Sequence, residues 1–142
     1  MQAKEYAPQV VELLKDSDSD VRITTAYALG QMQAKEQVPK VIELLKDSDS
    51  RVRIAAAYAL GQMQAKEYAP KVVELLKDSD SRVHSAAAYV LGQMQAKEYA
   101  PKVVELLKDS DFFVRSAAAD ALGQMQAKEY VPKLPSVDVS GR

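Results

Sequence analysis

The chain has 142 residues, enough for one domain of ordinary size, and 19 basic against 20 acidic side chains leave a formal net charge of -1. That balance argues against a basic nucleic-acid binder and against a polybasic membrane-surface protein. The sequence has no cysteine, which excludes disulfides, thiolate nucleophiles, zinc–thiolate sites and iron–sulfur clusters.

The sequence repeats with a period of 31 residues. All five methionines and five of the six prolines keep this spacing, and so do the single glycines Gly30, Gly61, Gly92 and Gly123. Four full copies span residues 1–31, 32–62, 63–93 and 94–124, and a partial copy spans 125–134. We interpret residues 1–134 as a single repeat domain and residues 135–142 as a polar tail.

Each copy contains two apolar stretches with helical spacing. The first stretch follows an i, i+3, i+4, i+7 pattern at Ala7, Val10, Val11 and Leu14. It predicts a helix from about residue 6 to 15, with Pro8 in the first turn. The second stretch predicts a helix from about 19 to 31 through Val21, Thr25, Ala28, Leu29 and Met32. Asp18 or Ser19 is well placed to cap this second helix, and no strand is expected.

A helix pair of this size cannot bury its own apolar face, so each copy must stack on the next. We therefore predict an all-α, right-handed or nearly straight α-solenoid of four helix pairs plus a C-terminal extra helix. The methionine series is expected to fill the core. Gly30 lies in the last turn of the second helix, where the absence of a Cβ allows close helix approach.

A recurring string joins the two predicted helices. In the first copy it reads Leu14-Lys15-Asp16-Ser17-Asp18-Ser19-Asp20-Val21-Arg22, followed by Ala26 to Gly30. The Asp and the Val-Arg pair recur as Asp47 with Val52-Arg53 and as Asp109 with Val114-Arg115, whereas His84 replaces the arginine in the third copy. Over about residues 1 to 134 this pattern resembles HEAT-like repeats of the short PBS-lyase type.

The chain departs from the natural family in two respects. Its copies are far more alike than those of natural arrays, and Gln33-Ala34-Lys35 replaces a Gly-Asp turn that is common in the family. The unit also resembles designed HEAT-like scaffolds of 31 residues. Near-identity of the copies fits either recent duplication or a consensus design.

The resemblance implies a non-enzymatic protein-binding scaffold, with an Asp16–Arg22 ladder along the turns. Some PBS-lyase-type members resemble or assist enzymes that attach bilin chromophores to phycobiliproteins, so a bilin-lyase-like protein or subunit is one alternative. A designed or consensus array that self-assembles and has no natural ligand is another. No residue pattern in the chain supports bilin chemistry by itself.

The sequence offers no catalytic, cofactor or metal site. His84 is the single histidine, so no Ser/His/Asp or Cys/His constellation can be assembled, and we expect it to fill the arginine position of the ladder. Asp16, Asp18 and Asp20 resemble the opening of a calcium loop, but Val21 and Tyr27 stand where Gly and Glu are required. Helix capping explains the same carboxylates. Glu12 and Lys15 are expected to form a solvated face.

The copies differ along one face of the second helix, at offsets 0, 1, 4, 5 and 8 from residue 19. In the arrays that this chain resembles, that surface is the concave, partner-binding one. Aligned apolar and aromatic side chains are typical of an interaction hot region, and drift at exposed positions does not readily explain a Phe112-Phe113 pair. We predict that a protein or peptide binds through Ile23, Tyr27, Arg51, Ile54, Tyr58, Arg82, Tyr89, Phe112 and Phe113.

Three further expectations concern partners and location. The first copy is as apolar as the internal ones, so uncapped repeat ends are predicted to dock on one another in a homo-oligomer. Arg51 and Arg82 alone make too weak a basic face for nucleic acid. No apolar run approaches the ~18 residues of a membrane span and no signal-peptide pattern opens the chain, so we expect a cytoplasmic protein without a membrane partner.

Overall fold

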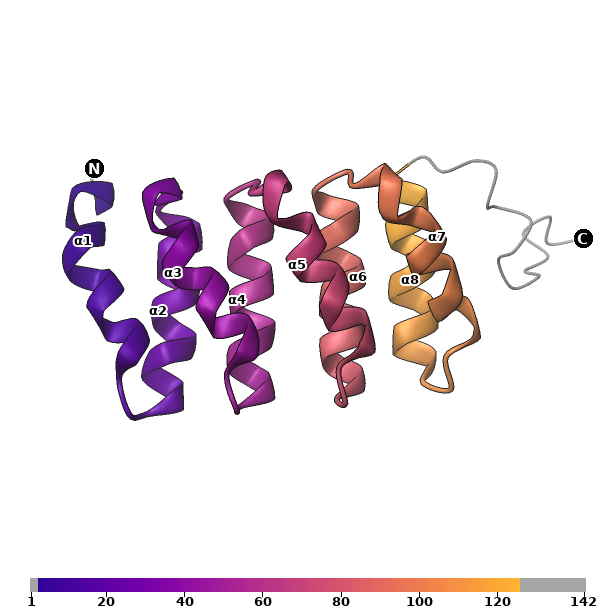
Figure 1. Ribbon diagram of the computed structural model, residues 1–142, viewed down its shortest axis with the longest axis horizontal. Coiled ribbons are helices and arrows are strands. Elements are labelled where there is room, and N and C mark those ends of the chain that lie inside the picture. The colour runs from indigo at the N-terminus through magenta and orange to yellow at the C-terminus, as the bar shows by residue number, and fades with distance from the viewer. Residues whose placement is uncertain (1–2, 126–142) are drawn as a thin grey trace, which may run out of the picture.

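The computed structural model describes residues 3–125, which form eight α-helices in two alternating series (Figure 1). The first series, here called the A helices, comprises α1 (Ala7–Val10), α3 (Val38–Glu43), α5 (Ala69–Val73) and α7 (Ala100–Val104). The second, the B helices, comprises α2 (Ser19–Gln31), α4 (Ser50–Gln62), α6 (Ser81–Gln93) and α8 (Phe112–Gln124). The described residues contain no strand, so the predicted all-α class is confirmed.

The B helices match their predicted limits, and the aspartate before each one is the cap. Asp18 Oδ1 accepts a hydrogen bond of 2.8 Å from the Asp20 N–H, and Asp49, Asp80 and Asp111 repeat this bond. Such a bond satisfies one of the free N–H groups in the first turn of a helix. Of the two residues proposed as caps, Asp18 therefore has this role and Ser19 is the first helical residue.

The A helices are shorter than predicted because 3₁₀ turns flank them. In the first copy the turns cover Ala3–Tyr6 and Val11–Lys15 around the four residues of α1. In later copies they cover Lys35–Gln37, Leu44–Lys46, Lys66–Tyr68, Glu74–Lys77, Lys97–Tyr99 and Glu105–Lys108. Turns of this type are common at helix ends, and the proline lies in the first turn of each A helix as predicted. We call an A helix with its two turns an A segment.

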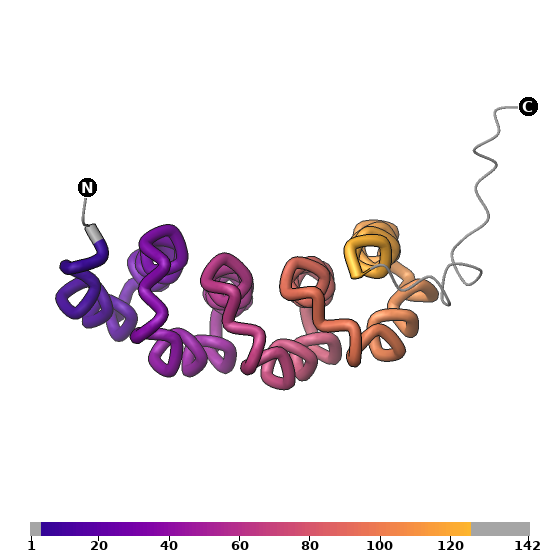
Figure 2. The backbone as a smooth tube through the Cα atoms, turned by 90° about the horizontal axis from the view of Figure 1, so that it is seen from above, coloured from indigo at the N-terminus to yellow at the C-terminus, as the bar shows by residue number. Residues whose placement is uncertain are grey.

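The two series form two layers of a curved stack. Seen from above, the stack is an arc in which the B helices line the inner side and the A segments the outer side (Figure 2). Each B helix packs against the next, in the order α2, α4, α6, α8. Between the layers lies a continuous core, with Leu29, Leu60 and Leu91 and the methionines Met63, Met94 and Met125 fully buried. The predicted stacking and the predicted role of the methionines are therefore confirmed.

Close approach of neighbouring B helices requires glycine. A Cβ added at Gly30 would lie 3.1 Å from the Cα of Ala59, and one at Gly92 would lie 2.9 Å from the Cα of Ala121. These distances are shorter than ordinary van der Waals contact, so the expectation for Gly30 is confirmed.

The turn after each of the first three B helices has a left-handed residue that is not glycine. The φ angles are 57° at Gln33, 53° at Gln64 and 57° at Gln95, in the region that favours glycine. A glycine at this place would adopt the same backbone without a Cβ penalty. The extra C-terminal helix predicted over 125–134 and the tail lie outside the described residues, apart from buried Met125. In the described part of the chain, no helix has the length and apolar character needed to cross a membrane.

Candidate binding surface

A row of three tyrosines crosses the B helices. The ring centroids of Tyr27 and Tyr58 are 6.5 Å apart, and those of Tyr58 and Tyr89 are 5.6 Å apart. Tyr27 and Tyr89 are 37% and 39% exposed, while Tyr58 between them is half-buried. Burial raises the pKa of Tyr27 and of Tyr58, so both hydroxyls remain protonated and can donate hydrogen bonds at neutral pH. We call Tyr27, Tyr58 and Tyr89 the tyrosine row.

A second row runs parallel to the first, near the start of the B helices. Arg51 Nη2 lies 2.9 Å from Asp49 Oδ2, and its Nη1 lies 3.2 Å from Asp20 Oδ1 in the preceding copy. Arg82 pairs with Asp80 at 2.8 Å and donates to the Ser50 hydroxyl. Hydrogen bonds from these arginines hold the pKa values of Asp49 and Asp80 well below the usual range. Both predicted arginines are thus exposed but already paired within the chain; we call Arg51 and Arg82 the arginine row.

The remaining predicted residues differ in exposure. Ile23 and Ile54 are half-buried and pack against the core. Phe112 and Phe113 begin α8, are 59% and 65% exposed, and have ring centroids 4.1 Å apart. Phe113 occupies the position of Arg51 and Arg82, so the arginine row gives way to an aromatic pair at the fourth copy. The structure therefore places all nine predicted residues on the B helices, with Ile23, Ile54 and Tyr58 half-buried and the other six exposed.

The arginines of the turn ladder bond the aspartate carbonyl of their own copy, and the carboxylate they pair with belongs to the next copy rather than to the same one. Arg22 Nε and Nη2 donate to the two carboxylate oxygens of Asp47 at 2.9 and 3.1 Å, and its Nη1 donates to the Asp16 carbonyl at 2.8 Å. Arg53 repeats this pattern with Asp78 at 2.8 and 3.0 Å. Burial raises the pKa of Asp78, but the hydrogen bond from Arg53, the Asp80 N–H and the charge of Arg53 outweigh it, so the net shift is downward.

His84 fills the arginine position at the third junction, as predicted. Its Nε2 contacts the Asp78 carbonyl, and its Nδ1 lies 3.5 Å from Asp109 Oδ2 without a hydrogen bond. The histidine therefore links repeats less well than arginine does. The carboxylates of the calcium-like string also have structural partners, since Asp16 accepts from the Asp18 N–H at 2.8 Å. The capping interpretation of that string is confirmed, and the described residues contain no cluster of three metal-binding side chains.

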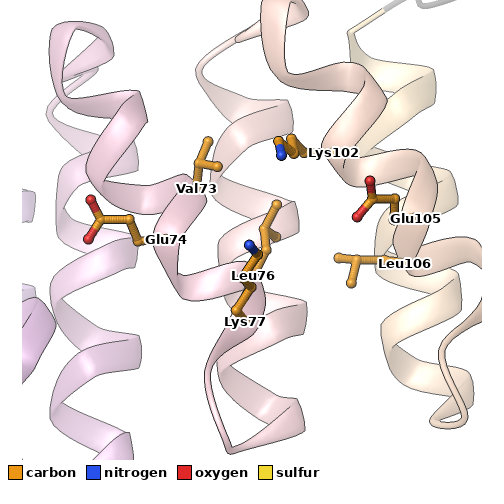
Figure 3. Close-up of a pocket in the computed structure, with 7 residues that line it drawn as sticks. All are labelled: Val73, Glu74, Leu76, Lys77, Lys102, Glu105 and Leu106. Atoms are coloured by element: carbon orange, nitrogen blue, oxygen red, sulfur yellow. The ribbon is translucent and has the colours of Figure 1, made fainter.

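Three grooves recur on the outer surface, between neighbouring A segments. Their volumes are about 30, 260 and 230 Å³ from the first junction to the third. The third is lined by Val73, Glu74, Leu76, Lys77, Lys102, Glu105 and Leu106 (Figure 3). Each groove has an apolar floor and a rim of two lysines and two glutamates. The sequence indicated the charged face but not these grooves, because a repeat period gives no spacing between A segments.

Comparison with known proteins places the chain in a family. A model for HEAT repeats matches residues 7–92 and 69–137, and the chain belongs to this family. A search of curated proteins by sequence finds no match.

Two solved structures share the fold. One is a chain in the structure of the complex of CpcE and CpcF of phycocyanin lyase from Nostoc sp. PCC7120. It shares 26% sequence identity with this chain, and the two align over 91% of this chain with a TM-score of 0.78. The other is a crystal structure of an engineered protein, with 23% identity, a TM-score of 0.67 and 90% coverage, a likeness of fold alone. The chain spans 57% of the lyase chain and 66% of the engineered one.

Proposed function

We propose that the protein is a non-enzymatic scaffold that binds a protein or peptide on the inner surface of its B helices. The observation that carries the proposal is the tyrosine row, in which three aromatic rings follow one another across three B helices, and the B helices line the inner side of the arc (Figure 2). The residues proposed to contact the partner are Ile23, Tyr27, Arg51, Ile54, Tyr58, Arg82, Tyr89, Phe112 and Phe113.

The composition of this surface supports a protein partner. Tyrosine and arginine dominate interaction hot spots because they bury a large area and keep polar atoms for hydrogen bonds. Phe112 and Phe113 add an exposed aromatic pair that makes no contribution to the core. Such a pair increases the exposed apolar area, which a partner would cover.

The test is affinity capture with mass spectrometry, using the wild type beside a triple variant with Tyr58→Ala, Tyr89→Ala and Phe113→Ala. We expect the wild type to recover a partner that the triple variant loses, while circular dichroism shows both chains folded. The matched control is Tyr6→Ala, since Tyr6 is a 55% exposed tyrosine that precedes α1 in the outer layer. Equal recovery by all three chains would discredit the proposed surface.

A second candidate is self-association through the ends of the stack. Leu13 is 46% exposed, whereas its equivalents Leu44, Leu75 and Leu106 are buried. Val21 is likewise half-buried, whereas the equivalent valines are fully buried. Sedimentation is expected to show a mass that rises with concentration for the wild type but not for Leu13→Glu. A wild-type monomer at every concentration rules this candidate out.

The two structural neighbours keep two alternatives open to test. Likeness to a chain of a phycocyanin lyase complex suggests a bilin-lyase-like subunit, and likeness to an engineered protein suggests a designed array without a natural ligand. The scaffold proposal predicts no change in visible absorbance when the chain is incubated with a bilin. A new covalent bilin band would favour the lyase alternative.

A further inference from the structure

We propose that the last full copy of one chain binds the first copy of a second chain, so that the stack of helix pairs continues from chain to chain. This inference rests on the self-association candidate above and deepens it, because it specifies which ends meet and which groups join them. We call the outward side of the copy at 1–31 the head end and that of the copy at 94–124 the tail end. The internal junctions between copies are the template for the contact.

The head end has an apolar stripe that later copies bury. Four of its side chains are more exposed than the equivalent side chain in every later copy, and they are Leu13, Val21, Ala28 and Met32. Val21, Ala28 and Met32 follow one another at intervals of seven and four residues along α2 and its C-cap, so they share one helix face. In the later copies the B helix packs against the preceding one, so the stripe is the face that a preceding copy would cover.

The tail end has an open face of small residues that matches this stripe. Gly123 is exposed and Ala119 is half-buried, whereas their equivalents in the first three copies are buried. At an internal junction the glycine lies against the next B helix, since a Cβ added at Gly30 would be 3.1 Å from the Cα of Ala59. Ala28 is the equivalent of Ala59 in the first copy, so the same close approach would bring Gly123 against Ala28 of the second chain.

The tail end also carries half of a salt bridge. At the first junction Arg22 donates from Nε and Nη2 to the two carboxylate oxygens of Asp47 in the next copy. Arg115 is the equivalent of Arg22, and its Nη1 bonds the Asp109 carbonyl in the same way, at 2.7 Å. Within residues 3–125, however, no carboxylate lies at salt-bridge distance from Arg115. Its Nε and Nη2 are therefore available to a carboxylate that a following copy would supply.

The head end offers that carboxylate. Asp16 is the equivalent of Asp47, and the Oδ1 atoms of both accept from the N–H two residues further on, at 2.8 and 2.9 Å. Asp47 also pairs with Arg22, but among the residues that the structure describes Asp16 has no arginine partner. A bidentate arginine–carboxylate pair fixes orientation as well as distance, so a bond from Arg115 to Asp16 of the second chain would set the register of the two stacks.

Residues 126–142 of the same chain are the other candidate to cover the tail end. They contain one aspartate, Asp138, and the match to the repeat stops at Pro135, so they lack the equivalents of Val21 and Ala28. A second chain supplies both the apolar stripe and the carboxylate in the spacing of an internal junction, and we therefore assign a second chain to this end. Because the two surfaces differ, the contact is heterologous and adds further chains instead of closing a two-fold dimer.

Two charge-reversal variants of the full chain test this inference. In Arg115→Glu the tail end repels Asp16, and in Asp16→Arg the head end repels Arg115. Each variant alone is expected to associate roughly thirtyfold more weakly than the wild type, or less. An equimolar mixture is expected to associate, because the altered tail end of one variant meets the altered head end of the other while their unaltered ends still match. Sedimentation equilibrium over a range of concentrations measures the mass in each case.

Two further variants separate the contact from folding. Within residues 3–125 no atom lies within 4 Å of a Cβ added at Gly123, so Gly123→Leu should keep the fold and block the tail end. Lys66→Glu makes the same change of charge as Arg115→Glu on an exposed side chain in the middle of the stack, and it should associate as the wild type does. Circular dichroism checks that every chain is folded.

The outcomes separate this inference from the candidate on which it rests. Association that Leu13→Glu abolishes but Arg115→Glu leaves unchanged would mean that two head ends meet, which would overturn the inference and leave self-association in place. A mixture of the two charge-reversal variants that stays monomeric would overturn the pairing of Arg115 with Asp16. A wild-type monomer at every concentration, expected if residues 126–142 cover the tail end, would overturn both. Binding on the inner surface is tested independently by the capture experiment.

Discussion

At the scale of single residues, the left-handed glutamines show how one side chain offsets an unfavourable backbone. Gln33 and Gln95 each donate from Nε2 to the carbonyl of the last residue of the following B helix, at 2.7 Å to Gln62 and 2.6 Å to Gln124. Gln64 has the same backbone, and no such bond is found for it among the described residues. The three positions are therefore alike in φ but differ in what the side chain contributes.

This difference gives a test by glycine substitution. A left-handed L-residue costs about 1–2 kcal/mol, and the added flexibility of unfolded glycine costs about 0.5–1 kcal/mol. Gln64→Gly is therefore expected to raise the free energy of unfolding by about 0.5 kcal/mol. Gln33→Gly also removes a hydrogen bond, so its free energy of unfolding should not rise. Urea denaturation of both variants measures this, and a less stable Gln64→Gly would contradict the explanation.

The histidine in the ladder gives a second residue-scale prediction. His84→Arg restores the side chain that bonds both carboxylate oxygens at the other two junctions, so it should stabilise the fold by about 1 kcal/mol. Thermal and urea unfolding measure the change. The same substitution in an Asp109→Ala background should give no gain, and an equal gain there would show that the ladder is not the cause.

At the scale of elements, the limits of the B helices were predictable and those of the A helices were not. Each B helix has an aspartate before its first residue, and cap residues set a helix start directly. The A segments lack a side-chain cap, and their apolar spacing fits α and 3₁₀ geometry equally over so few residues. The carboxylate partner of Arg22 could not be predicted either, because a repeat period does not say which copy supplies that carboxylate.

The packing of neighbouring B helices predicts opposite effects at two equivalent glycines. Gly92→Ala places a Cβ 2.9 Å from the Cα of Ala121, so the helices must separate and stability should fall. At Gly123 no atom of residues 3–125 lies within 4 Å of the added Cβ, so Gly123→Ala should gain up to about 1 kcal/mol of stability from helix propensity. Denaturant midpoints of the two variants test this. Equal effects at both glycines would contradict close approach as the reason for Gly92.

The salt bridges of the turn ladder also predict that the stability of the fold depends on pH. The pKa of Asp78 is lower in the folded chain than the ordinary value near 3.9, so its stabilisation is complete above about pH 4. It is lost as pH falls through the lower folded pKa, because the unfolded chain then binds the proton first. Asp78→Asn should be less stable at pH 7 and lose less stability on going to pH 3. Urea unfolding from pH 7 to pH 3 measures the free energy of unfolding of both chains. Parallel pH curves for the wild type and Asp78→Asn would contradict this prediction.

At the scale of the whole molecule, the curvature of the stack gives the two layers different roles. The B helices approach one another closely on the inner side, which brings the tyrosine row together, while the A segments leave grooves between them on the outer side (Figures 2 and 3). A stack in which each copy contacts only its neighbours can vary its inner surface without changing its core. This is why the face that differs between copies was predictable from the chain alone, whereas the grooves between the A segments were not.

The most direct test of inner-surface binding is photo-cross-linking with the recovered partner. A benzoyl-phenylalanine replaces Ser85 of the B helix α6 in one chain and Val73 in an outer groove in another. The account predicts a covalent product from position 85 and none from position 73. Cross-linking from position 73 alone would show that the partner binds the outer layer and would contradict the account.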